Sequence, residues 1–148
     1  MDDFARLPND ERRVYFEQAA AQLGLSAVII EKDFWVCWCL RRLFSIDVFQ
    51  DHLTFKGGTS LSKVYRIIDR FSEDVDIAIE RDFLGFGGDH DPEEARSGKE
   101  QRRRIVRLKE TCQSLVENQL LTQYGNEIAG ALPDIANWEL SVDPGDPD

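Results

Sequence analysis

Residues 56–80 read KGGTSLSKVYRIIDRFSEDVDIAIE, and this stretch decides the fold. Immediately before it, polar and apolar residues alternate over 52–56, which predicts a short strand that Gly57 and Gly58 end. Apolar residues then recur at helical spacing, and over 73–80 they alternate again, which predicts a second strand. The sequence therefore predicts a strand, a glycine pair, a helix and a second strand in direct succession.

Two aspartates in the second predicted strand are candidate metal ligands. Asp74 and Asp76 lie two residues apart, so both carboxylates project from one face of the strand, while Val75, Ile77 and Ile79 form an apolar opposite face. Two oxygen ligands on one face suit the Mg²⁺ that accompanies the phosphates of a nucleotide. Two such ions can hold the attacking and leaving oxygens of an in-line displacement, so the pair is a candidate catalytic site.

The glycine pair predicts a phosphate site beside these carboxylates. Gly57 and Gly58 precede a helix whose first backbone N–H groups are free to bind an anion, and glycine lets a phosphate approach the backbone closely. The Walker A pattern GxxxxGK[ST] is absent. An anion site next to a cation site is what phosphoryl or nucleotidyl transfer requires. The side chains that could add contacts to a triphosphate are Thr59, Ser60 and either Lys56 or Lys63.

Length and composition limit the classes of protein that fit. The chain has 148 residues, 42% of them hydrophobic, which predicts one folded domain rather than a disordered chain. With 18 Lys and Arg against 28 Asp and Glu the net charge is −10, so the overall field does not attract nucleic acid or anionic membranes. No apolar run approaches the roughly 20 residues of a membrane span, and no signal-peptide pattern is present. Three cysteines cannot all pair, so we expect a cytoplasmic protein.

Two helices are predicted in residues 1–50. Asn9 is the expected N-cap of the first, and Ser26 is the expected N-cap of the second, over residues 27–44. Apolar residues surround so much of the second helix that we expect it to be deeply buried. We therefore divide the chain into a helical lead-in at residues 1–50, which packs on the core, and a core at residues 51–148.

The second half of the chain is predicted to be mostly helical. A flexible loop is expected over 81–98, then a long helix over 99–123, a short helix over 126–132 and a last strand over 138–142. The chain closes with DPGDPD, a strong turn signal that should lead into a further strand. We therefore expect this sequence to be the N-terminal fragment of a longer protein, incomplete at its C-terminus.

The long predicted helix carries the densest group of cations in the chain. Such a run is usually a solvated helix face. In a chain that is acidic overall, it is also the natural candidate for a surface that faces phosphates, so both interpretations stay open. The cations are Arg102, Arg103, Arg104, Arg107 and Lys109.

The glycine pair and the aspartates together resemble a known signature. Gly57-Gly58 followed by Asp74-x-Asp76 is similar to the signature of the DNA polymerase beta-like nucleotidyltransferases. The longer string FKGGTSLSKVYRIIDRFSEDVDIAI resembles, more narrowly, the AbiEii nucleotidyltransferase toxins, relatives of the MenT toxins, in which KGGTxLxK precedes RFSxDxD. Glu31-Lys32-Asp33 also lies where these proteins carry an upstream acidic helix motif. The resemblance is sharp over residues 31–80.

This resemblance implies an activity and a set of site residues. The implied protein is the toxin of an abortive-infection or toxin–antitoxin system, with a cognate antitoxin, that uses Mg²⁺ to transfer a nucleotide from a nucleoside triphosphate to an acceptor such as tRNA or another RNA. Asp74 and Asp76 would bind the metal, and Arg70 with Ser72 would shape the loop before them. The implied nucleotide-binding set is Lys56, Gly57, Gly58, Thr59, Ser60, Lys63, Arg70 and Ser72.

The fold we predict from the pattern and the resemblance is α/β (α+β). It is a nucleotidyltransferase fold, in which a small mixed sheet is flanked by helices and preceded by the helical lead-in. The family pattern also expects a third carboxylate on a later strand. Asp143 and Glu139 are weak candidates, and we expect the true third carboxylate to lie beyond residue 148. The alternative hypothesis is a non-catalytic protein-interaction module on the same fold, which would not need Asp74 or Asp76.

Overall fold

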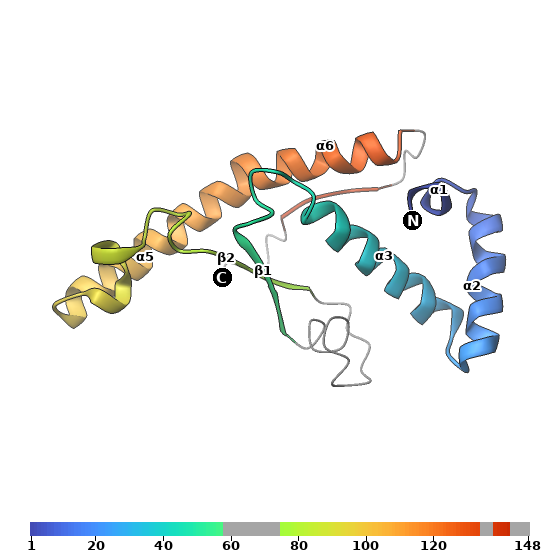
Figure 1. The fold of residues 1–148 in the computed structure, drawn as a ribbon, viewed down its shortest axis with the longest axis horizontal. Helices are drawn as coiled ribbons and strands as arrows, with labels where there is room; N and C mark the ends of the chain where they lie inside the picture. Colours follow the sequence, from blue (N-terminus) through green and yellow to red (C-terminus); the bar gives the residue numbers. More distant parts are fainter. Residues whose placement is uncertain (58–74, 134–137, 143–148) are drawn as a thin grey trace.

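Two antiparallel strands, here called the hairpin, pack beside the middle of one long helix, and the three N-terminal helices lie toward the C-terminal end of that helix (Figure 1). The computed structural model describes residues 1–57, 75–133 and 138–142. The predicted α/β architecture, with a small sheet, flanking helices and a helical N-terminal segment, is confirmed. In chain order the elements are α1 (Asp2–Ala5), α2 (Asn9–Leu23), α3 (Ala27–Leu43), β1 (Leu53–Lys56), β2 (Asp76–Ile79), the 3-10 turns η1 (Gly88–His90) and η2 (Pro92–Glu94), α5 (Gly98–Leu115), the π-helical turn η3 (Val116–Leu120) and α6 (Leu121–Ala131).

Both predicted N-terminal helices are present, one of them with a different cap. α3 follows Ser26, whose Oγ accepts a hydrogen bond from a backbone N–H three residues on, at 3.3 Å, as predicted. α2 has Pro8 as its N-cap and Asn9 as its first helical residue, so the prediction of an Asn9 cap was wrong. The Asn9 side chain instead accepts a hydrogen bond from the guanidinium of Arg12. Arg12 is buried and also donates to two backbone carbonyls at and just after the end of α1, which ties α1 to α2.

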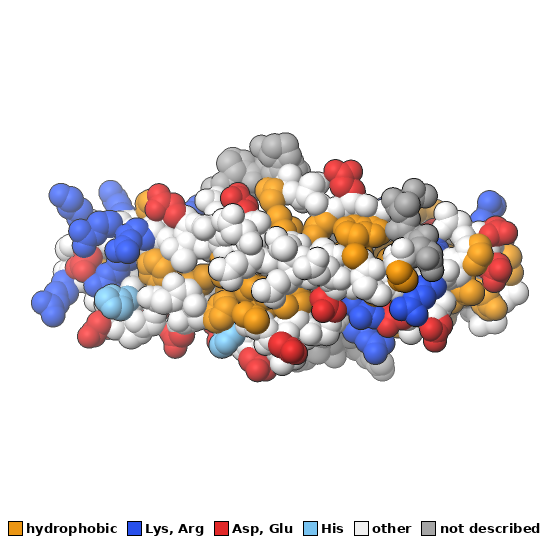
Figure 2. Space-filling model, turned by 90° about the horizontal axis from the view of Figure 1, so that it is seen from above, with side chains coloured by type: hydrophobic (Ala, Val, Ile, Leu, Met, Phe, Trp, Pro, Cys, Tyr) orange, Lys and Arg blue, Asp and Glu red, His pale blue; other side chains and the backbone are white. Residues whose placement is uncertain are grey.

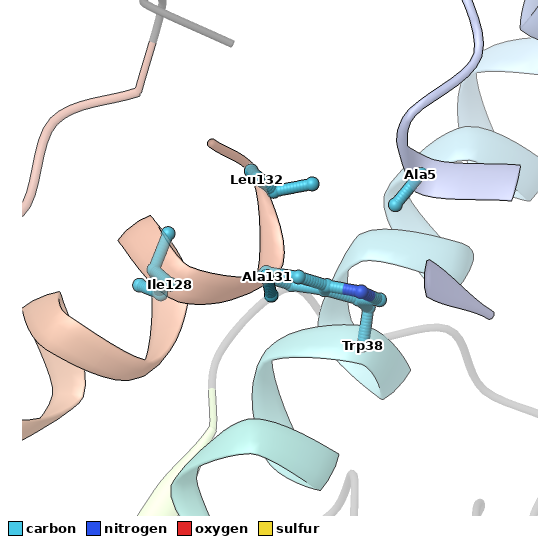
Figure 3. Packing of buried hydrophobic residues seen from close by; sticks show 5 residues of the cluster. All are labelled: Ala5, Trp38, Ile128, Ala131 and Leu132. Carbon is cyan, nitrogen blue, oxygen red and sulfur yellow. The ribbon is translucent and has the colours of Figure 1, made fainter. Parts of the chain in front are cut away.

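α3 is half-buried, not deeply buried as predicted. Trp38 is the one fully buried residue of this helix, whereas Val28 is 60% exposed. An apolar circumference predicts burial only if neighbours surround the helix, and among the described residues α3 packs mainly on α2 and α6. Trp38 packs with Ala5 of α1 and with the end of α6, where the buried residues are Ile128, Ala131 and Leu132 (Figure 3); we call this group the first core cluster.

Polar contacts fix the position of Trp38 within the first core cluster. Its indole Nε1 donates to Asp2 Oδ1 at 3.0 Å, so the buried N–H is satisfied by α1. The guanidinium of Arg42 lies 5.5 Å from the Trp38 ring centre and forms an ion pair with Asp2. The hydrogen bond from Arg42 lowers the pKa of the Asp2 carboxyl. α1 is therefore held to α3 by one linked set of an indole, a carboxylate and a guanidinium.

The hairpin has one covered face and one exposed face. β1 pairs with β2 in the register Leu53↔Ile79, Thr54↔Ala78, Phe55↔Ile77 and Lys56↔Asp76. Because side chains alternate along a strand, the pairs that begin with Leu53 and Phe55 share one face. That face carries the apolar residues, and the opposite face presents Lys56 and Asp76 to solvent. The predicted alternation on both strands is confirmed over these residues.

A second core cluster anchors the hairpin to the long helix. Its buried residues are Ile46, Phe49 and Leu53, which lie at and before β1. Ile77 and Ile79 of β2 pack against it, as do three partly buried residues of the long helix, Leu115, Leu120 and Tyr124. Tyr124 also packs on the first core cluster, and its hydroxyl donates to the carbonyl of Cys39 at 3.1 Å. Burial raises the pKa of Tyr124.

α5, η3 and α6 form one continuous helix, so the predicted break between residues 123 and 126 was wrong. A glycine in a helix interior lowers helix stability by about 1 kcal/mol relative to alanine, so the sequence favours a break around Gly125. Tyr124 and Ile128 flank this glycine and pack into the core clusters, and their burial outweighs that cost. The irregularity lies earlier, where η3 widens the helix by a π-turn at Val116–Leu120.

The segment 138–142 is not the strand that we predicted. It pairs with no strand in the part of the chain that the structure describes. A Cβ built on Gly125 of α6 would lie 3.9 Å from the side chain of Leu140, so the segment crosses the helix at a residue without a side chain. Apolar alternation predicts a strand only where a ladder partner is available, and here the apolar residues contact a helix instead.

The three cysteines and the helices were also compared with what the sequence predicts for disulfides and membrane spans. Cys37, Cys39 and Cys112 are free and half-buried, and burial raises the pKa of Cys37 and Cys112. Among the described helices, none combines the length and the apolar character that crossing a membrane needs.

Candidate functional site

The candidate site begins where the exposed face of the hairpin ends. Lys56 is the last residue of β1 and Asp76 is the first of β2, and the two are cross-strand partners. Residues opposite each other in an antiparallel pair have Cβ atoms about 5 Å apart. The Lys56 ammonium and the Asp76 carboxylate therefore lie at the same corner of the sheet. The apolar face of the same strands is fixed on the second core cluster, which holds this corner in place.

Gly57 brings the backbone of β1 directly under the Asp76 carboxylate. Its φ is +74°, in the left-handed region that side chains other than glycine rarely adopt. A Cβ built on Gly57 would lie 2.8 Å from Asp76 Cγ and would overlap Asp76 Oδ2. Glycine is therefore required here for two reasons, the backbone conformation and the space that the carboxylate occupies. The glycine and the aspartate that the sequence predicted to act together are in contact.

The charges at this corner are available to a ligand. The Lys56 and Asp76 side chains are both exposed, and among the described residues neither forms a hydrogen bond or ion pair. An exposed ammonium can neutralise a phosphate, and an exposed carboxylate can bind a divalent cation. The corner thus carries a lysine that can contact the phosphate of a metal–phosphate ligand and an aspartate that can contact its metal.

The other predicted site residues lie outside the described part of the chain. The structure places Lys56, Gly57 and Asp76, and it brings these three together. No contact, distance or orientation is assigned to the rest. The residues of the predicted set that lie outside the described ranges are Gly58, Thr59, Ser60, Lys63, Arg70, Ser72 and Asp74, together with the third-carboxylate candidate Asp143.

Glu139, the other candidate for the third carboxylate, is exposed and lines a cavity of 650 Å³. The cavity lies among α2, α3 and α6, with Arg12, Trp35 and Tyr124 in its wall, and no described residue of β1 or β2 lines it. Glu139 is thus associated with the N-terminal helices, whereas Asp76 is on the hairpin. The expectation that Glu139 sits on a strand was wrong, because segment 138–142 joins no described strand.

The donor set at the hairpin corner fits a magnesium ion as far as the described residues go. Carboxylate oxygens are the ligands that Mg²⁺ prefers, and the ion usually keeps several waters and binds through one or two carboxylates plus substrate phosphates. Asp76 supplies such a carboxylate with open surroundings. No group of three His, Cys, Asp or Glu side chains that could hold a metal occurs within the described ranges.

Replacing Gly57 with alanine tests the contact between glycine and aspartate. We expect Gly57→Ala to lose about 1–2 kcal/mol of unfolding free energy, because alanine is strained at this φ, and to weaken Mg²⁺–nucleotide binding roughly tenfold by displacing Asp76. Gly24→Ala is the matched control, since φ is +68° there but a Cβ would have no neighbour within 4 Å. Denaturant unfolding and calorimetry measure the two effects. Equal nucleotide affinity in both variants would contradict a role for the Gly57–Asp76 contact.

Comparison with known proteins identifies the family. The family model described as nucleotidyl transferase AbiEii toxin, type IV toxin–antitoxin system, matches residues 38–140, which is more than half of the chain. The match includes β1, β2 and the whole of the long helix. No curated protein and no solved structure gave a significant match. Because this match covers more than half of the chain, the chain belongs to the AbiEii nucleotidyl transferase toxins of type IV toxin–antitoxin systems.

Proposed function

We propose that this chain uses Mg²⁺ to transfer a nucleotide from a nucleoside triphosphate to an RNA acceptor such as tRNA, as the toxin of its toxin–antitoxin system. Membership in the family supports a nucleotidyl transferase and implies a cognate antitoxin. The observation that carries the finer proposal is the approach of the Asp76 carboxylate to the backbone of Gly57 beside Lys56. An acidic group, a glycine backbone and a lysine at one corner match the needs of a metal-bound triphosphate.

Each residue of the proposed site has a distinct task. Asp74 and Asp76, two apart in sequence, would hold Mg²⁺, which when bound supplies a positive charge that neutralises the phosphates. The glycine pair would let the phosphates approach the backbone N–H groups, and Lys56 or Lys63 would neutralise a further oxygen. We assign triphosphate contacts also to Thr59, Ser60, Arg70 and Ser72.

The division of the chain is part of the proposal. We assign residues 1–50 to a helical lead-in and residues 51–148 to the nucleotidyltransferase core. Support comes from the first core cluster, in which Ala5 and Trp38 of the N-terminal part pack on Ile128 and Ala131 of α6. The lead-in would thereby hold the far end of the helix on which the hairpin rests.

Calorimetric titration of the four nucleoside triphosphates, with and without Mg²⁺, tests the proposal directly. We expect one or more of them to bind only when Mg²⁺ is present, and the preferred base identifies the donor. The double variant Asp74→Asn/Asp76→Asn should lose this binding, because each amide keeps the shape of the carboxylate but removes its charge. Asp51→Asn, an exposed aspartate outside the predicted site, is the control and should bind as the parent does.

Two results would contradict the proposed site. One is a folded protein that binds no triphosphate in the presence of Mg²⁺. The other is binding that persists unchanged in the double variant, which would place the nucleotide elsewhere on the molecule. Circular dichroism of each variant establishes that it is folded, so that lost binding is not confused with lost structure.

A further inference from the structure

A groove of 580 Å³ lies between the loop after β2 and α5. Loop residues Phe86 and His90 line one side, and α5 residues Arg103, Arg107 and Thr111 line the other. Figure 2 shows Lys and Arg side chains gathered at the end of the molecule where α5 begins in Figure 1, with a histidine beside them. None of these residues belongs to the proposed nucleotide site.

The loop that forms one wall is held in a defined conformation. It contains the turns η1 and η2, and Arg81 binds the carboxylates of Asp91 and Glu93, each at 2.8 Å. Arg104 of α5 donates to the backbone carbonyls of Asp89 and Asp91, both at 2.7 Å. Two arginines therefore clamp the loop onto itself and onto α5. The sequence predicted a flexible loop here because it could not show these long-range contacts.

The arginines of α5 divide into one that builds the groove and two that are left for a ligand. Arg104 is half-buried and bonded to Glu100 at 2.6 Å, and this hydrogen bond lowers the pKa of the Glu100 carboxyl. The Arg103 and Arg107 side chains are exposed, and among the described residues neither forms a hydrogen bond or ion pair, although the charge of Arg103 helps to lower the pKa of the Glu100 carboxyl. They lie four residues apart, one helical turn or roughly 6 Å along the axis, so each can reach a different phosphate.

The local charge opposes the charge of the whole chain. Residues 99–109 hold six Lys and Arg against one Glu, although the chain carries a net charge of −10. Two carboxylates face the groove, and Glu100 is already paired with Arg104 while Asp89 remains as the one uncompensated acid in its wall. A cationic surface kept on an acidic protein favours an anionic ligand at this place.

The aromatic residues of the groove favour a nucleic acid over a simple anion. Phe86 lines the groove and is half-buried, and its backbone N–H donates to the Arg81 carbonyl at 2.8 Å, which fixes the main chain at this position. Unpaired bases stack on aromatic rings, and the combination of a basic groove with such rings is typical of single-strand binding. A duplex offers no free base faces to Phe86 or His90, which favours a single strand.

We propose that this groove binds a single-stranded segment of RNA, with Arg103 and Arg107 on successive phosphates and Phe86 stacked on a base. The groove follows the end of β2 opposite to Asp76, so a mononucleotide at Asp76 would not occupy it. That this RNA is the acceptor for transfer rests on the proposed function, whereas the binding of RNA itself does not.

Fluorescence anisotropy with a labelled 12-nucleotide single-stranded RNA, measured over a series of salt concentrations, tests the groove. We expect Arg103→Ala/Arg107→Ala to weaken binding roughly tenfold and to reduce the slope of log K against log salt by about 1.4, since each single-strand phosphate contact contributes about 0.7. Phe86→Ala should weaken binding roughly tenfold with the slope unchanged, because stacking does not release counterions. Both variants should bind Mg²⁺–triphosphate as the parent does.

Lys99→Ala/Arg102→Ala is the matched control, because it removes two positive charges from the same helix outside the groove. It should leave the slope nearly unchanged. The proposal is overturned if the parent does not bind the RNA, if both double variants weaken binding equally, or if polyglutamate competes as well as RNA does. Loss of RNA binding with retained triphosphate binding separates this groove from the site at Asp76, so either can fail without the other.

Discussion

Replacement of Asp76 with alanine is expected to lower the rate of nucleotide transfer roughly a thousandfold, while the protein remains folded. In the proposed mechanism the carboxylate that lies against Gly57 holds the metal that neutralises the triphosphate, and alanine could not do so. Stability should change by no more than about 0.5 kcal/mol, since the Asp76 side chain is exposed. Transfer of a labelled nucleotide to RNA measures the activity, and thermal unfolding measures the stability. Asp74→Ala should give the same loss.

The same variants decide between the enzyme and the alternative of an interaction module. If toxicity in cells comes from nucleotide transfer, then Asp74→Ala and Asp76→Ala each remove it, and Asp51→Ala, an exposed control, does not. If the chain acts through protein contacts alone, neutralising the two aspartates leaves its toxicity unchanged. Full toxicity in a variant that has lost all measurable transfer would therefore reject the enzymatic mechanism of action.

Replacement of Trp38 with alanine is expected to give the largest loss of stability, about 3–5 kcal/mol of unfolding free energy. Trp38 is 2% exposed and is one of the two largest fully buried side chains, with Phe49. It fills the space between α1, α3 and the end of α6, and its indole also donates to Asp2. Alanine would leave a cavity there and an Asp2 carboxylate with one hydrogen bond fewer. Urea unfolding followed by circular dichroism measures the change.

Two further tryptophan variants separate packing from surface effects. Trp38→Phe keeps a large ring but removes the indole N–H, so it should cost about 1–2 kcal/mol and remain folded even if the alanine variant does not. Trp138→Ala removes the same side chain from a position that is 38% exposed, and it should cost less than about 1 kcal/mol. A Trp38→Ala variant as stable as Trp138→Ala would show that the first core cluster does not hold the helices together.

The hairpin shows how far local pattern can carry a prediction. Alternation of apolar residues around Leu53, Phe55, Ile77 and Ile79 indicated both strands and the face that each buries, and the structure agrees. The glycine at the end of β1 was predicted to let a phosphate approach the backbone, which stays a prediction; the structure adds that the Asp76 side chain lies against Gly57. A two-residue period and a glycine are local signals, so they can be read without knowing the rest of the fold.

The errors fall where burial depends on distant partners. The helix does not break near Gly125, because Tyr124 and Ile128 are buried by α3 and the hairpin segment, which lie far away in sequence. Segment 138–142 has strand-like alternation, but a strand needs a partner, and Leu140 lies on α6 instead. Apolar residues lie on most sides of α3, yet Trp38 is the only residue of this helix that is buried.

The family, the strands of the hairpin and the candidate site residues could be predicted from the sequence, because a short motif of glycines and aspartates needs only local spacing to be recognised. The tertiary structure was needed to show which arginines of α5 are bonded to the loop and which are exposed. Arg103, Arg104 and Arg107 are alike in sequence, but the loop after β2 folds back so that its carbonyls bind Arg104 and leave the other two exposed. Such a division depends on contacts between residues far apart in the chain, which local spacing cannot specify.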